Sequence, residues 1–185
     1  KYLDFAAGIA VCGLGYGNPE LTAAVKEQTE LLWHTSNLFY NASCGTAAEA
    51  LKKASGMDRV FFTNSGTEAN EGMLKAARKY AWKKKTGRYE FIAMEGSFHG
   101  RSMGALSVTE HEAYRTPFEP LIPGVKFAKF NDLEDFASKI TKNTIAIMIE
   151  PVQGEGGVHP ATQEFMEGLR KLCDDNHLLL LLDEV

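Results

Sequence analysis

Short apolar runs alternate with segments of helical periodicity along most of this chain. The runs are continuous rather than alternating in polarity, which is typical of strands that are covered on both faces. Such strands between helices predict an α/β fold with a central, mostly parallel sheet and helices on both faces. The expected strands read RVFFTN, RYEFIAM, VKFAKF, TIAIMIE and HLLLLLD. We predict that the leucines of the last run form a central, buried strand.

Helix signals lie between and before these runs. Asn18, Pro19 and an acid in the first turn mark one helix start, and Thr162 caps another. Gly56 is expected to end a small-residue helix that begins near Gly45. The segment YLDFA is a candidate edge strand. The helix after RVFFTN is amphipathic, with one apolar face made of Met73, Leu74, Ala77, Tyr80 and Ala81.

Composition excludes several classes of function. The net charge of −4 argues against a nucleic-acid partner, which usually needs a basic face. No apolar run is long enough to span a membrane. Three scattered cysteines without a CxxC pair predict no disulfide framework, and no metal site is expected because His99 has no second ligand at a suitable spacing. The N-terminal residues lack a signal-peptide pattern and suggest that something precedes them.

The residues that follow each strand are the candidate site, because ligands of open parallel sheets bind beyond the carboxyl ends of the strands. After RVFFTN come Ser65, Gly66 and Thr67, which open a helix. Free N–H groups at a helix start favour an anion such as a phosphate. An ordinary helix cap is the alternative interpretation of these residues.

Residues after two further strands could contact an aromatic ligand ring and the charged groups of a substrate. Phe98 lies between glycines and could present its face to a ring, while Arg101 could bind a carboxylate in fork geometry. A core-plugging phenylalanine and a solvated arginine are the alternatives. Glu150 and Glu155 follow TIAIMI in a glycine-rich loop, where they could set charges around a substrate, pair with an arginine or remain solvated.

Asp183 ends the last apolar run. A carboxylate at the end of a buried strand needs a cationic or donor partner, and a protonated ring nitrogen is one. An apolar run followed by Asp-Glu is also typical of the Walker B strand of a P-loop ATPase. That alternative requires a Gly-Lys phosphate loop, and the dipeptide is absent from this sequence.

These features are a helix start suited to an anion, an aromatic ring after a strand, an arginine for a carboxylate and an acid at the end of the last apolar run. Taken together, they resemble the site of class III, ornithine-type aminotransferases. The resemblance covers essentially all residues and lies in YLDFAAGIAVCGLGYGNPEL, HTSNLFYN, VFFTNSGTEANEGMLKAARKY, GSFHGRSMGALS, IEPVQGEGGVHPA and LLLLDEV. It implies the large domain of pyridoxal phosphate (PLP) fold type I, present incompletely. Residues 1–45 would be an N-terminal segment and interface region, and residues 46–185 part of the PLP-binding domain.

The resemblance also implies a role for each matched residue. Gly66 and Thr67, with Ser65 beside them, would bind the cofactor phosphate. Phe98 and Val185 would pack on opposite faces of the pyridine ring, and Asp183 would pair with its protonated nitrogen. The substrate residues would be Arg101 for a carboxylate, Glu155 as a switch acid that pairs with a downstream arginine, and Asn37 and Tyr40 near the substrate entrance at a homodimer interface.

The implied activity is transamination of N-acetylornithine with 2-oxoglutarate in arginine biosynthesis. Ile9 stands where ornithine-specific members tend to carry a tyrosine, although ornithine, succinylornithine and γ-aminobutyrate remain alternative donors. The Schiff-base lysine is expected beyond Val185, so no catalytic residue is assigned in this chain and we expect it to be inactive by itself. The expected compartment is the mitochondrial matrix in a eukaryote and the cytoplasm otherwise.

Overall fold

The computed structural model describes residues 1–185, which form two compact units. The first unit comprises Lys1–Phe61 and the second Phe62–Val185. None of the helices combines the length and the apolar character that a membrane span requires.

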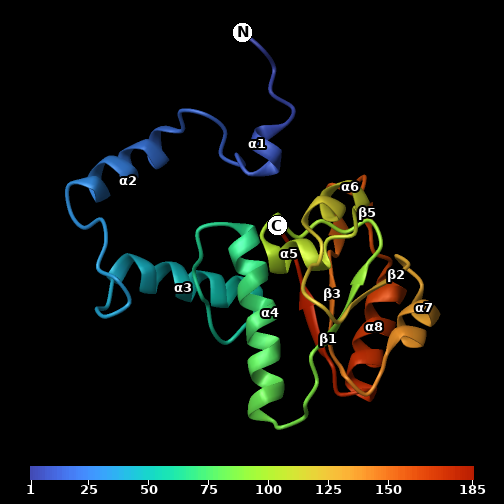
Figure 1. Cartoon of the computed structure of the whole chain (residues 1–185). Helices are drawn as coiled ribbons and strands as arrows, with labels where there is room; N and C mark the ends of the chain where they lie inside the picture. The colour runs from blue at the N-terminus through green and yellow to red at the C-terminus, as the bar shows by residue number, and fades with distance from the viewer. The chain divides into compact units, whose positions relative to one another are not determined.

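The second unit is built on a parallel four-stranded sheet of order β2-β1-β3-β6 (Figure 1). All three neighbouring pairs are parallel, and Ile147 of β3 pairs with residues of both β1 and β6. Every residue of β3 is buried, which explains its uninterrupted apolar sequence. The strands are β1 (Glu90–Met94), β2 (Val125–Ala128), β3 (Thr144–Ile149) and β6 (Leu179–Leu182).

Helices cover both faces of this sheet, as the sequence predicts (Figure 1). One face packs on α4 (Gly66–Lys83) and α5 (Met103–Val108), with Leu74, Ala77 and Val108 in the shared core. The other face packs on α7 (Leu133–Lys139) and α8 (Gln163–Asp175), whose buried residues include Phe136, Phe165 and Leu169. Thr162 caps α8 by accepting a hydrogen bond from the N–H of Phe165 at 3.1 Å, as predicted.

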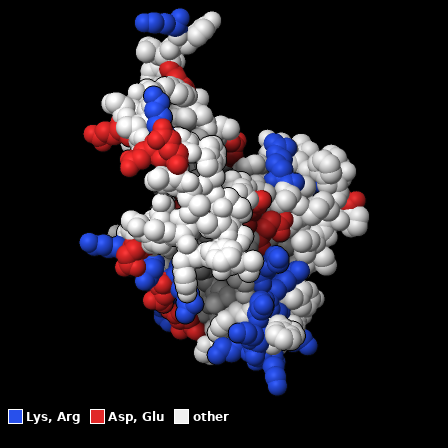
Figure 2. All heavy atoms as spheres, turned by 90° about the vertical axis from the view of Figure 1, so that its left-hand side faces the viewer, with Lys and Arg blue, Asp and Glu red and all other residues white.

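Short elements connect these layers at the carboxyl ends of the strands. The helical turns α6 (Glu112–Arg115) and η1 (Thr116–Phe118) precede β2. The antiparallel pair β4 (Val152–Gln153) and β5 (His159–Pro160) frames the glycine-rich loop after β3. The lysines of α4 are exposed. Figure 2 shows Lys and Arg side chains gathered in the lower part of the view.

The first unit contains α1 (Ala7–Ala10), α2 (Pro19–Thr29) and α3 (Ala42–Ser55). Asn18 caps α2 and Gly56, at φ +71°, ends α3, both as predicted. None of these helices buries a residue within the chain. The predicted division between residues 45 and 46 falls inside α3, and it remains a prediction about function.

Two strand predictions are wrong, and a third is confirmed as a strand but wrong about its place in the sheet. RVFFTN forms no strand, and Phe61 and Phe62 are 77% and 45% exposed, because no neighbouring backbone pairs with this segment. YLDFA likewise has no strand partner. The leucine run does form β6, but β6 is an edge strand of this sheet and its residues are only partly buried. Apolar content alone therefore did not determine which strands find neighbours.

Candidate active site

Asp183 is the centre of a buried polar network at the carboxyl end of β6. Its Oδ2 accepts hydrogen bonds from Nδ2 of Asn70 and from Nδ1 of His99, both at 2.7 Å. Its Oδ1 accepts a bond from the N–H of Val185 at 3.1 Å. The residue is 6% exposed, and its own N–H is bonded to the carbonyl of Ile149 on β3. The strand thus delivers a nearly dehydrated carboxylate to the sheet end, as the sequence predicts.

The network keeps this carboxylate ionised. Burial by itself raises the pKa of Asp183, but the hydrogen bonds from His99, Asn70 and Val185 and the charge of His99 together lower it below the ordinary value. Since an ionised carboxylate only accepts, the proton of the His99–Asp183 bond lies on Nδ1. Oδ1 has a single protein donor, which leaves it acceptor capacity for a cationic ligand.

Asn70 and His99 were not predicted as members of this site. Asn70 uses its amide twice, since Nδ2 also donates to the carbonyl of His99 at 2.8 Å. It thereby links α4, the loop after β1 and the end of β6. The N–H of His99 donates to Oγ1 of Thr109 at 2.8 Å, while Nε2 is buried without a partner. The available signal was an asparagine within the apolar stripe of α4, in line with Leu74 and Ala77.

The start of α4 serves both as a helix cap and as a set of free donors. Oγ of Ser65 accepts a bond from the N–H of Glu68 at 3.2 Å, which is the ordinary cap considered above. The N–H groups of Gly66 and Thr67 have no acceptor in the chain. The hydroxyl hydrogen of Ser65 is also free to donate. These donors and the helix dipole favour an anion at this end of α4.

Two glycines allow the strand ends to approach the start of α4. A Cβ on Gly66 would lie 2.9 Å from Cγ2 of Val185, so the Val185 side chain would have to shift to make room for it. A Cβ on Gly100, at φ +130°, would clash with the side chain of Thr67. Gly66, Thr67, Gly100 and Val185 therefore lie together with the Asp183 network, as expected for one site.

The loop after β1 is tied to the loop after β3 by Glu150. Its Oε2 accepts a bond from the N–H of Phe98 at 3.1 Å, and its Oε1 one from the N–H of Gly154 at 3.4 Å. Burial raises the pKa of Glu150, against the opposing effect of these bonds. The structure thus gives Glu150 backbone N–H partners, and no arginine of this chain forms an ion pair with it.

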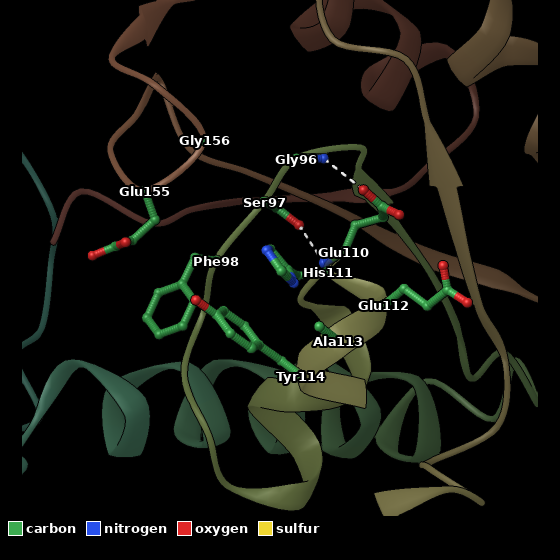
Figure 3. Close-up of a pocket in the computed structure, with 10 residues that line it drawn as sticks. All are labelled: Gly96, Ser97, Phe98, Glu110, His111, Glu112, Ala113, Tyr114, Glu155 and Gly156. Carbon is green, nitrogen blue, oxygen red and sulfur yellow. Dashed lines mark hydrogen bonds between the residues drawn. The ribbon is translucent and has the colours of Figure 1, made fainter. Parts of the chain in front are cut away.

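A cavity of about 640 Å³ opens between these two loops (Figure 3). Phe98 and Glu155 line it from opposite loops. His111 and Tyr114, which the sequence did not identify, line it from the α6 turn and its N-cap. The guanidinium carbon of Arg101 lies 3.8 Å from the centroid of the Tyr114 ring and 5.8 Å from that of Phe98. The structure therefore brings Phe98 and Arg101 together beside this cavity. Asn37 and Tyr40 lie exposed in the first unit.

Comparison with known proteins identifies the class that this fold and site define. The sequence matches the family Aminotransferase class-III over residues 1–185, and the chain belongs to this family. Class III aminotransferases depend on pyridoxal phosphate. Family membership confirms the predicted fold type and leaves no support for the P-loop alternative.

Similar curated relatives include acetylornithine aminotransferases. The chain is 50% identical to acetylornithine aminotransferase of Clostridium acetobutylicum, covering 100% of this chain and 48% of the relative. It is 48% identical to the mitochondrial acetylornithine aminotransferase of Debaryomyces hansenii, covering 100% and 41%. The chain spans about half the length of the curated relatives it matches.

Solved structures agree in fold. N-acetylornithine aminotransferase from Stenotrophomonas maltophilia matches with a TM-score of 0.81 at 41% identity, over 98% of this chain and 45% of that one. Ornithine aminotransferase from Toxoplasma gondii, a structure that reports partial occupancy of PLP at its active site, matches with a TM-score of 0.92 at 31% identity, over 98% and 44%.

Proposed function

We propose that the protein transfers the δ-amino group of N-acetylornithine to 2-oxoglutarate, as a step of arginine biosynthesis. The observation that carries this proposal is the buried, ionised Asp183 beside the free N-terminus of α4. Identity of 50% to an acetylornithine aminotransferase supports the choice of donor.

The residues of the second unit fit pyridoxal phosphate. The N–H groups of Gly66 and Thr67, with the hydroxyl of Ser65, are unpaired donors suited to a phosphate. Phe98 offers a ring face and Val185 an apolar side chain that is 90% exposed, suited to opposite faces of a pyridine. Asp183 supplies the negative charge for a protonated ring nitrogen.

The contribution of Asp183 to the reaction is electrostatic. When bound, pyridoxal phosphate supplies an electron sink that works best with its ring nitrogen protonated. Asp183 favours that protonation because a dehydrated carboxylate raises the pKa of a neighbouring base. Each pKa unit is worth about 1.4 kcal/mol. Asn70 and His99 keep the carboxylate charged and oriented, so their donors stabilise the form of Asp183 that the ring nitrogen needs.

On the substrate side, we propose that Arg101 binds a carboxylate and that Glu155 pairs with an arginine downstream of this chain. Arg101 makes no hydrogen bond or ion pair with the protein, and Glu155 is exposed in the cavity. Both are therefore available to outside groups.

We further propose that the protein is a homodimer in which Asn37 and Tyr40 lie near the substrate entrance. The first unit buries no helical residue of its own, and Trp33, Phe39 and Tyr40 are all more than two-thirds exposed. Apolar surface of this kind is typical of an interface. A mitochondrial relative supports the matrix as the compartment in a eukaryote, with the cytoplasm expected otherwise.

The cofactor assignment is tested by absorbance of the full-length protein. We expect a PLP band in the wild type and its loss, or a marked weakening of PLP affinity, in Asp183→Ala. The matched control is Glu184→Ala, which removes the adjacent, exposed acid and is expected to retain the band. A folded full-length protein that binds no PLP would refute the proposal.

The donor is tested by half-reaction rates with N-acetylornithine, ornithine, succinylornithine and γ-aminobutyrate. We expect N-acetylornithine to react with the highest kcat/KM, since donor discrimination reflects differential transition-state binding. Ornithine is the second candidate, because the ornithine aminotransferase of T. gondii matches this fold with a TM-score of 0.92. A higher kcat/KM for ornithine would replace the first proposal by the second.

A further inference from the structure

Tyr114 is an aromatic residue of α6 that lies against the guanidinium of Arg101. The guanidinium carbon is 3.8 Å from the ring centroid, which is close enough for a stacked cation–π contact. Phe98 is farther from the same guanidinium, at 5.8 Å. Tyr114 is therefore the principal protein contact of this charged group.

This contact leaves the hydrogen-bonding edge of Arg101 free. A guanidinium carries its N–H donors in its plane, so an aromatic ring on its face uses none of them. The protein gives Arg101 no hydrogen bond and no ion pair, although Glu110, Glu112 and Glu155 line the adjacent cavity. An arginine that is contacted on its face by an aromatic ring, with its N–H donors unused, can bind an incoming carboxylate.

Tyr114 is itself held in place by two aromatic neighbours. The His111 ring stacks on it at a centroid distance of 3.9 Å and an interplanar angle of 12°. Phe98 meets it edge to face at 6.3 Å and 82°. Figure 3 shows the Phe98, Tyr114 and His111 side chains gathered along one side of the cavity. The ring is thus fixed by the same loop that carries Phe98 and by its own helical turn.

We propose that Tyr114 is a positioning residue that orients Arg101 for the carboxylate of the amino donor and acceptor. This inference rests on the proposed function and adds a determinant of its specificity for carboxylate substrates. Tyr114 lowers the freedom of a long, exposed side chain before the substrate arrives, so less conformational entropy is lost on binding. The aromatic face does this work, and the phenol hydroxyl is not required.

The test compares Tyr114→Leu and Tyr114→Phe in the full-length holoenzyme. The first readout is the dissociation constant of glutarate, a dicarboxylate with no reacting carbonyl, measured by calorimetry. We expect Tyr114→Leu to weaken glutarate binding about 3- to 10-fold, which corresponds to about 0.7–1.4 kcal/mol. Tyr114→Phe is expected to remain within about twofold of the wild type, because it keeps the ring.

The second readout separates positioning from a general structural role. Tyr114→Leu is expected to raise KM for 2-oxoglutarate with little change in kcat, and to leave kcat/KM for n-butylamine, a donor without a carboxylate, unchanged. In an Arg101→Ala background, the same substitution is expected to have no further effect on glutarate, as in a double-mutant cycle for a shared function.

The matched control is Tyr80→Leu, which removes an exposed cation–π partner, that of Lys84 at 5.8 Å, near the other end of α4. It is expected to leave glutarate binding unchanged. Equal glutarate affinity in wild type and Tyr114→Leu, additivity with Arg101→Ala, or equal losses for n-butylamine would each overturn the inference. A wild-type protein that transaminates no donor would instead overturn the proposed function.

Discussion

Nδ1 of His99 lies 2.7 Å from Oδ2 of Asp183, and the two side chains are 0% and 4% exposed. The same carboxylate oxygen accepts the amide of Asn70 at 2.7 Å. Two donors from elements far apart in sequence thus converge on one oxygen at the end of β6. Their geometry links the stability of the fold to the charge that the proposed site needs.

Asn70→Ala is expected to destabilise the protein by about 1.5–3 kcal/mol at pH 7, the usual range for a hydrogen bond to a charged group. The variant also leaves the carbonyl of His99 without its amide donor. Urea unfolding measures the loss. Asn64→Ala is the matched control, because this exposed side chain has no hydrogen bond, and its effect is expected within about 0.5 kcal/mol.

The cost of Asn70→Ala is also expected to depend on pH. The folded-state pKa of Asp183 is lowered, so ionisation contributes stability above the unfolded-state pKa, and this contribution is lost as pH falls through the folded-state pKa. The difference between wild type and variant should therefore shrink at acid pH. A difference that stays constant from pH 7 to pH 3 would contradict the role of the charged carboxylate.

Gly100→Ala is expected to cost about 2–5 kcal/mol in the free energy of unfolding. The new Cβ would meet the side chain of Thr67, and φ +130° is a conformation that L-residues avoid. Gly72→Ala is the matched control in α4, where a Cβ meets nothing within 4 Å. It is expected to stabilise the protein by about 0.5–1 kcal/mol. Thermal and urea unfolding compare the two variants, and equal effects would contradict the predicted close approach.

The sequence predicts the sheet well where burial alone determines the pattern. TIAIMI reads as a covered strand because all six residues of β3 are buried. RVFFTN also contains a short apolar run but forms no strand, since apolar content carries no information about which backbone lies alongside. For the same reason, the sequence predicts the leucine run at the centre of the sheet, whereas β6 lies at its edge.

The site was predictable to the extent that it depends on strand ends. Asp183 follows β6, so its placement at the carboxyl edge follows from the parallel sheet. The partners Asn70 and His99 depend on how α4 is rotated against the sheet, which a single sequence does not state. The contact of Arg101 with Tyr114 likewise depends on the path of an irregular loop. The cofactor- and substrate-binding roles of the matched residues come from the resemblance to a family.

Glu71→Ala is expected to loosen α5 against α4. The carboxylate of Glu71 accepts bonds from the hydroxyl of Ser102 and from the N–H groups of Gly104 and Ala105, at 2.8 and 3.2 Å for the two amides. Losing this cap should cost about 1–3 kcal/mol. Hydrogen exchange should show faster exchange of the α5 amides. Lys79→Ala, on the exposed face of α4, is the control and should leave them protected; equal protection in Glu71→Ala would count against the cap.

Cys173 is expected to resist thiol reagents until the protein unfolds. Burial raises the pKa of its thiol to about 11, and the side chain belongs to the core between α8 and the sheet. At pH 8 the thiolate fraction is therefore about one in a thousand, and the reactive form is also inaccessible. Iodoacetamide labelling followed by mass spectrometry should modify the exposed Cys44 in the native protein and Cys173 only in denaturant. Comparable labelling rates for Cys173 in the folded and unfolded protein would show that this core is open.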